Sequence, residues 1–193
     1  MKIQISRTST AALAIGFLLI PAAFTEEKPK PDSYSAVWVV TGGTAGGSSV
    51  SINIHIDRYN TDQDIRTYAD ILSTNGPAGL RRALEKEDVG QFSPVGRVGT
   101  PLSIARKLKK GDKTIIRVVT LRNLSFAELR NSGRSVDYPY TMLELVLGKD
   151  GKGTGTAIGA AKIRFDRKKN IYEIESFRHG ADYNKLLNVR VEN

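Results

Sequence analysis

Two histidines and two aspartates have the clearest potential for chemistry in this chain. His55 and Asp57 stand two residues apart, and His179 and Asp182 lie close together near the C-terminus. On a β-strand, residues two apart share a face, with Cβ atoms about 7 Å from each other. His55 and Asp57 would therefore be able to share a metal ion or form a carboxylate-oriented general base, and with His179 and Asp182 they would supply the four ligands of a zinc ion. The alternative interpretation is a polar outer strand face with no chemistry.

The placement of His55 depends on residues 49–57 being extended. Polar and apolar residues alternate here, which puts Ile52, Ile54 and Ile56 on one face. β-Branched residues at every second position favour a strand over a helix. We therefore predict a strand that turns its isoleucines inward and His55 outward.

The preceding glycine-rich segment resembles a cofactor loop. Residues 41–48 read Thr-Gly-Gly-Thr-Ala-Gly-Gly-Ser after an apolar run, which is similar to the TGxxxGxG loop of short-chain dehydrogenases. That resemblance implies a dinucleotide held at a helix N-terminus, but Ser48 replaces the third glycine and a strand pattern follows instead of a helix. No tyrosine has a lysine four residues later, so the family's catalytic pair is missing as well. We interpret the glycines as a connection between two strands and expect no cofactor.

The N-terminus has the pattern of a secretory signal peptide. Lys2 and Arg7 precede an apolar stretch at 11–20, and small residues follow it. We predict a signal peptide at 1–25, a disordered leader at 26–33 and a single α+β domain at 34–193, with an uncleaved membrane anchor as the alternative. The chain has no cysteine, which excludes a lipid-modified N-terminal cysteine and disulfides. The expected location is therefore secreted or periplasmic.

The charge balance favours anionic partners. Removing Lys2 and Arg7 with the signal peptide leaves 27 of the 29 basic residues against 20 acidic ones, a net charge of +7. Lipid headgroups, acidic glycans or another anionic ligand suit such a surface, as does an envelope protein, whereas export argues against nucleic acid. A modest charge bias that serves solubility alone is the alternative.

The remaining pattern predicts an antiparallel sheet with a helical insertion. Thr61 is a suitable N-cap, and two helical segments separated by Asn75-Gly76-Pro77 predict a helical hairpin at about 62–87. Short turns separate the strands, so antiparallel pairing is expected. The fold class is α+β, with about eight or nine strands in a curved sheet or partly closed barrel. Expected strands include 102–108, 114–120, 141–147, 154–165, 171–177 and 186–191.

Two further segments are candidates for binding. Arg130, Arg134, Tyr138 and Tyr140 combine guanidinium groups with aromatic rings, as interaction surfaces do, although the tyrosines would also suit packing at the start of a strand. The basic run at 106–110 is either protection for an edge strand or a surface for anionic lipid.

The sequence contains no complete catalytic motif. Gly-x-Ser-x-Gly is absent, and pairing Ser48 or Ser49 with His55 has no motif behind it. We therefore expect an exported, non-enzymatic binding or structural domain of the cell envelope or extracellular space. The alternative is a metal-dependent or hydrolytic enzyme that uses His55, Asp57 and His179.

Overall fold

The computed structural model describes residues 31–40, 48–122, 137–177 and 184–192. The predicted signal peptide lies outside these ranges, as do His179, Asp182, Arg130 and Arg134. The elements are β1 (Asp32–Val40), β2 (Ser48–Ile56), α1 (Asp62–Leu84), β3 (Gly90–Pro94), β4 (Thr100–Lys110), β5 (Lys113–Leu121), β6 (Tyr140–Leu147), β7 (Lys152–Asp166), β8 (Ile171–Ser176) and β9 (Asn184–Glu192).

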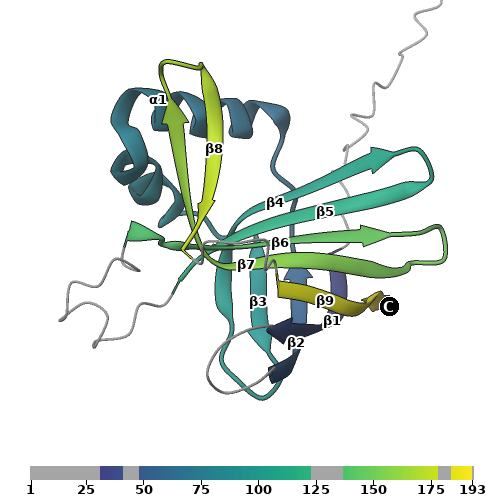
Figure 1. Ribbon diagram of the computed structural model, residues 1–193. Helices are drawn as coiled ribbons and strands as arrows, with labels where there is room; N and C mark the ends of the chain where they lie inside the picture. The colour runs from purple at the N-terminus through teal and green to yellow at the C-terminus, as the bar shows by residue number, and fades with distance from the viewer. Residues whose placement is uncertain (1–30, 41–47, 123–136, 178–183, 193) are drawn as a thin grey trace, which may run out of the picture.

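Eight of the nine strands form a closed antiparallel barrel (Figure 1). The strand order is β6-β5-β4-β3-β2-β1-β9-β7, and pairing between β6 and β7 closes the ring. The first half of β7 pairs with β9, and its second half pairs with β8, which lies outside the ring. The predicted α+β class and barrel-like antiparallel sheet are thus confirmed.

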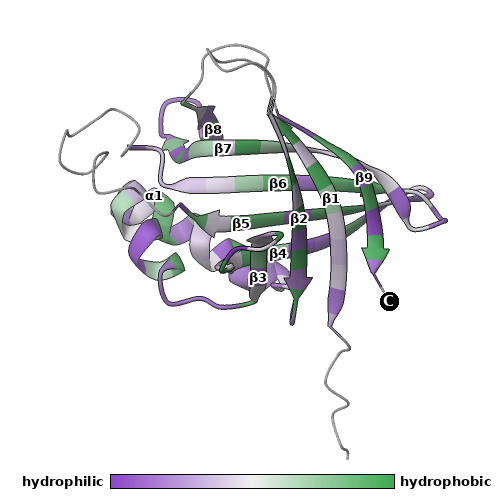
Figure 2. Cartoon of the chain, turned by 90° about the horizontal axis from the view of Figure 1, so that it is seen from below, coloured by the Kyte–Doolittle hydropathy of each residue, from purple (hydrophilic) through white to green (hydrophobic). Residues whose placement is uncertain are grey.

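The strand prediction for residues 49–57 is also confirmed. β2 pairs with β1 from Val40↔Ser48 to Asp32↔Ile56, so the glycine-rich segment connects two antiparallel strands and no helix follows it. β2 alternates hydrophobic and hydrophilic residues along its length (Figure 2). Ile52, Ile54 and Ile56 are no more than 1% exposed, while His55 faces outward.

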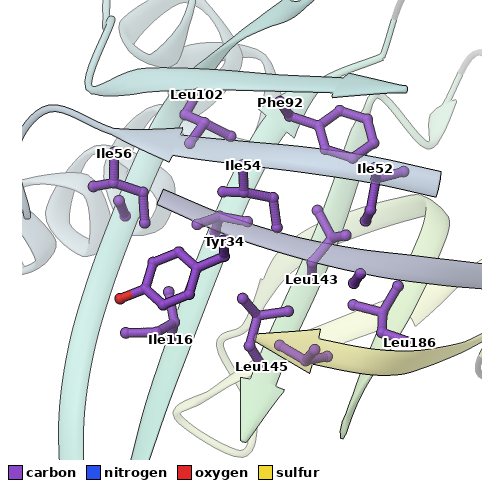
Figure 3. Close-up of a cluster of buried hydrophobic side chains, with 14 of the residues drawn as sticks. Tyr34, Ile52, Ile54, Ile56, Phe92, Leu102, Ile116, Leu143, Leu145 and Leu186 are labelled. Atoms are coloured by element: carbon purple, nitrogen blue, oxygen red, sulfur yellow. The ribbon is translucent and has the colours of Figure 1, made fainter. Parts of the chain in front are cut away.

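Apolar side chains fill the interior of the barrel (Figure 3). Every strand of the ring contributes at least one of them, so the interior is a packed core, as expected for a barrel of this strand number. The buried cluster comprises Tyr34, Ala36, Ile52, Ile54, Ile56, Val89, Phe92, Leu102, Ala105, Ile116, Val118, Leu143, Leu145, Leu147, Ala157, Leu186 and Val189.

A second apolar cluster lies between α1 and the outer wall of the barrel. Leu72, Leu80 and Leu84 of α1 pack there with residues of β5, β6 and β7.

A capping box starts the helix, since the Thr61 hydroxyl accepts from the Asp64 amide and the Asp64 carboxylate accepts from the Thr61 amide. The two predicted helical segments are both present within α1, which has a kink at Gly76, where φ is 69° and Pro77 follows. Leu72 and Leu80 on the two sides of this kink both reach the same cluster. In the described part of the chain, no helix has the length and apolar character needed to cross a membrane.

Candidate functional site: the barrel mouth

One end of the barrel is an open hollow of about 500 Å³, which we call the barrel mouth. The β4–β5 and β6–β7 hairpins project past the neighbouring strands at this end (Figure 1). Its lining comprises Asp32, Tyr34, Lys107, Lys109, Gly111, Asp112, Lys113, Thr114, Leu147, Gly148, Lys149, Gly151 and Val191. Four lysines against two aspartates give this lining a formal charge of +2.

A β-bulge in β4 turns two of these lysines toward the barrel axis. The register between β4 and β5 shifts between Leu102 and Ile104, so that Leu102 and Ala105 both belong to the interior core. An extra residue at a bulge reverses the alternation of the side chains that follow it. Lys107 and Lys109 therefore share the inward face of Ala105, and they stand directly above the packed core.

A hydrogen-bonded cluster forms the floor of the mouth. The Asp32 carboxylate oxygen Oδ2 accepts from the Tyr59 hydroxyl at 2.6 Å, from Lys107 Nζ at 2.8 Å and from the Tyr34 hydroxyl at 3.3 Å. The two tyrosine hydroxyls are 3.0 Å apart. Lys107 Nζ also lies 5.4 Å from the centre of the Tyr59 ring, within the range of a cation–π contact. Residues from β1, β4 and the β2–α1 connection thus meet at one carboxylate.

The electrostatics of this cluster fix its protonation state. Burial alone would raise the pKa of the Asp32 carboxyl, but hydrogen bonds from Lys107 and Tyr59 and the lysine charge outweigh it, so that pKa lies below its usual value. Burial raises the pKa of Tyr34 to about 12. Burial, together with the hydrogen bond to Asp32, also raises the pKa of Tyr59. At neutral pH both tyrosines therefore stay protonated, and they act as hydrogen-bond donors rather than as bases.

The rim of the mouth carries cations that its own carboxylates do not neutralise. Lys149 Nζ lies 3.0 Å from Asp112, in an ion pair whose side chains are 75% and 80% exposed. Within the described ranges, neither Lys109 nor Lys113 has an ion-pair or hydrogen-bond partner for its ammonium group. The rim can therefore offer free ammonium groups to an anion, above a floor that holds one more ammonium and two hydroxyl groups.

The predicted His55–Asp57 pair forms on the outer face of the barrel wall. His55 Nε2 lies 3.2 Å from Asp57 Oδ1, and the two side chains are 48% and 60% exposed. The other nitrogen of the same imidazole, His55 Nδ1, lies 2.8 Å from the Ser33 hydroxyl. Ser33 sits directly opposite His55 in the β1–β2 register. Sequence reasoning considered Ser48 and Ser49 as partners for His55 and missed Ser33, which the hairpin register would have identified.

This outer-wall set lacks other parts of a catalytic or metal site. Among the described residues, no three histidine, aspartate or glutamate side chains gather as a metal site would require. His179 and Asp182, which the predicted zinc site needs, lie outside the described ranges. The arrangement can polarise the Ser33 hydroxyl through His55, but both imidazole and carboxylate stand in solvent.

The predicted binding loop is described only at its end. Tyr138 packs edge-on against Phe177 with ring centres 5.4 Å apart, and Lys162 Nζ lies 5.9 Å from the Tyr138 ring. Tyr140 is 1% exposed and belongs to the cluster under α1, which is the packing role that the sequence left open. Burial raises the pKa of Tyr140 to about 12.

Comparison with known proteins adds no assignment to this geometry. No protein-family model, no curated protein and no solved structure matches the chain. The fold defines a closed eight-stranded antiparallel barrel with one flanking helix and one additional strand. A barrel of this kind does not by itself specify a function, which depends on the side chains of the site.

Proposed function

We propose that this chain is an exported, non-enzymatic binding protein that holds an anionic group in the barrel mouth. The observation that carries the proposal is the inward orientation of Lys107 and Lys109 above an apolar core, with Lys109 unpaired within the described ranges. Both lysines are exposed, so water solvates their ammonium groups in the open mouth. Lys107 already has Asp32 as its partner, whereas Lys109 is available to pair with a bound anion.

The tyrosines of the floor support a binding role over a catalytic one. With raised pKa values they stay protonated at neutral pH and donate to the Asp32 carboxylate, so neither tyrosine serves as a general base. The packed core below the floor fills the interior, so a ligand that enters this end of the barrel makes contact at the mouth. The predicted signal peptide directs such a binding site to the envelope or the extracellular space, where lipid headgroups and acidic glycans are the available anions.

The test compares two lysines of equal charge. Lys109→Ala removes an unpaired cation from the mouth, whereas the matched control Lys168→Ala removes an exposed cation from the β7–β8 turn. Binding is measured by calorimetry with glycerol phosphate and with a uronic-acid oligosaccharide, and by co-sedimentation with phosphatidylglycerol vesicles. A lysine near an anionic surface contributes about 1 kcal/mol, so Lys109→Ala is expected to weaken binding about fivefold while the control is unchanged.

The three probes separate the sources of the anionic group. Binding of vesicles alone identifies a lipid surface, whereas binding of a soluble probe identifies a small ligand or a glycan. In each case the affinity must fall as salt rises, because the attraction is electrostatic. Equal losses for Lys109→Ala and Lys168→Ala would show that only net charge matters, and the proposed site would be rejected.

A second candidate function rests on the Ser33–His55–Asp57 contacts. The 2.8 Å and 3.2 Å distances on the two sides of the imidazole favour a hydrolytic enzyme that uses His55 as a base. This candidate retains His55 and Asp57 from the sequence analysis, with His179 as a further candidate residue. Turnover of a nitrophenyl ester that disappears in both His55→Ala and Ser33→Ala would establish it, and unchanged turnover in either variant would exclude it.

A further inference from the structure

Strand β8 is the terminal strand of the sheet. All six of its residues pair with β7, from Asp166↔Ile171 to Ala161↔Ser176, and no described strand pairs with its other side. The β7–β8 hairpin projects past the barrel beside α1 (Figure 1). An unpaired strand edge presents backbone donors and acceptors to any extended chain, and soluble proteins normally shield such edges.

Contacts with α1 and with β7 hold this edge in place. The Tyr172 hydroxyl donates to the Ala69 carbonyl of α1 at 3.4 Å, and the Arg167 guanidinium donates to the Ser73 carbonyl at 3.2 Å. The Tyr172 ring also packs on Phe165 of β7, with ring centres 4.9 Å apart. The edge is therefore preorganised, which lowers the entropic cost of adding a strand to it.

The two faces of β8 differ in chemistry. Tyr172 and Ile174 lie opposite Phe165 and Ile163, so they extend the apolar surface under α1, yet they remain 51% and 53% exposed. The other face carries Glu173 and Glu175. A strand added beside β8 would therefore place alternate side chains against an apolar strip and against two carboxylates.

Cations on β7 and in the turn hold the carboxylates in position. Arg164 lies 2.8 Å from Glu173 and 3.1 Å from Glu175, and Lys169 lies 3.2 Å from Glu173. All of these cations come from the β7 side of β8 or from the turn. The added strand would meet the carboxylates from the opposite side.

Charge disfavours a second copy of this chain in the registers that centre on residues 173–175. Antiparallel pairing of β8 with itself, centred on Glu173 or on Glu175, places that glutamate opposite its own copy. Centring on Ile174 places Glu173 opposite Glu175 twice. Like charges directly opposite each other destabilise a strand pair.

From these observations we propose that β8 is a docking edge for an extended segment of a partner protein that alternates apolar and basic residues. The segment adds as a strand beside β8, with its apolar side chains on Tyr172 and Ile174 and its basic side chains beside Glu173 and Glu175. Backbone pairing supplies the attachment, and the alternation of side chains supplies the specificity. This site is separate from the barrel mouth and does not depend on it.

The test uses two short peptides that alternate valine with lysine or valine with glutamate. The whole chain carries a net charge of +9, so non-specific attraction would favour the glutamate peptide. The proposal predicts the reverse, with the lysine peptide binding about tenfold more tightly or better. Fluorescence anisotropy of labelled peptides measures both affinities.

Two variants and one control locate the binding. Ile174→Lys is expected to weaken binding of the lysine peptide at least about tenfold, because it adds a cation to the apolar strip. Glu175→Lys is expected to reverse the preference between the peptides. Val98→Lys, at a position 93% exposed in the β3–β4 connection, is the matched control and should change neither affinity. Thermal melting checks that each variant folds.

Each other outcome overturns the proposal. Binding of neither peptide, equal binding of both, or a preference that Glu175→Lys does not alter shows that β8 does not select a basic, alternating strand. Self-association of the free protein that Ile174→Lys abolishes, measured by light scattering, shows instead that a second copy occupies the edge.

Discussion

Replacement of Asp32 by asparagine tests the floor of the barrel mouth most directly. Asp32 Oδ2 accepts hydrogen bonds from Tyr59, Lys107 and Tyr34, and the side chain is 28% exposed. Hydrogen bonds to a charged group contribute about 1.5–3 kcal/mol each when buried, less where solvent competes. Asparagine keeps one oxygen acceptor for a tyrosine and loses the ion pair with Lys107.

We expect Asp32→Asn to lower the free energy of unfolding by about 2 kcal/mol, which for a chain of this size lowers the Tm by about 4–8 °C. The same change leaves Lys107 without its carboxylate, so affinity for an anionic probe should rise while stability falls. Urea denaturation measures the first effect, and calorimetry with glycerol phosphate measures the second. A stability loss accompanied by tighter binding is not expected from general damage to the fold.

A double-mutant cycle that combines Asp32→Asn with Tyr59→Phe tests whether the floor of the mouth acts as one hydrogen-bonded unit. Because the Tyr59 hydroxyl and the Asp32 carboxylate are 2.6 Å apart, the two substitutions should show a coupling free energy of about 1 kcal/mol. Asp112→Asn is the control, since its ion pair with Lys149 is almost fully exposed and such pairs contribute little. If Asp32→Asn costs no more than Asp112→Asn and the cycle shows no coupling, the floor does not act as one hydrogen-bonded unit.

Two further predictions concern stability. The pKa of Tyr34 is about 12 in the folded chain against 10.0 for a free tyrosine, so its stabilisation is complete below pH 10 and is lost as the pH rises toward 12. Urea denaturation from pH 9 to pH 12 should show a fall that Tyr34→Phe makes smaller, while the raised pKa values of Tyr59, Tyr68 and Tyr140 account for the part that remains. Gly90→Ala should cost about 3 kcal/mol or more, because a Cβ there would lie 2.1 Å from the His55 carbonyl oxygen at a φ of 145°, whereas Gly96→Ala, at a φ of 79° with open space around it, should cost about 1 kcal/mol. Equal melting temperatures for the two glycine variants would contradict this reasoning.

Local patterns predicted much of the fold, because strand alternation and turn chemistry act over a few residues. The isoleucines of β2, the Thr61 cap and the strands expected at 102–108 and 114–120 are of this kind, and each lies where the sequence indicated. Local patterns do not predict closure of the barrel, because closure depends on β6 pairing with β7 while β7 also pairs with β9. The lengths of the segments that connect the strands do not determine which of these strand pairs form.

The barrel mouth was harder to predict, because it depends on one inserted residue. Without the bulge near Ser103, strict alternation from Leu102 would turn Lys107 and Lys109 outward, and for that reason the sequence indicates edge protection or a lipid surface for the basic run at 106–110. The contact between Asp32 and Lys107 joins residues 75 positions apart. Nothing in the spacing of those residues indicates that they meet.

The packed interior of the barrel also has a kinetic consequence. A ligand enclosed within a barrel must wait for strands or loops to part before it can enter or leave. Here isoleucine and leucine side chains occupy that volume, so an anion at the mouth would associate at a rate set by diffusion and charge, and would exchange without any opening of the wall. The fraction of protein with a bound anion would therefore adjust to a change in ionic strength at a rate set by diffusion.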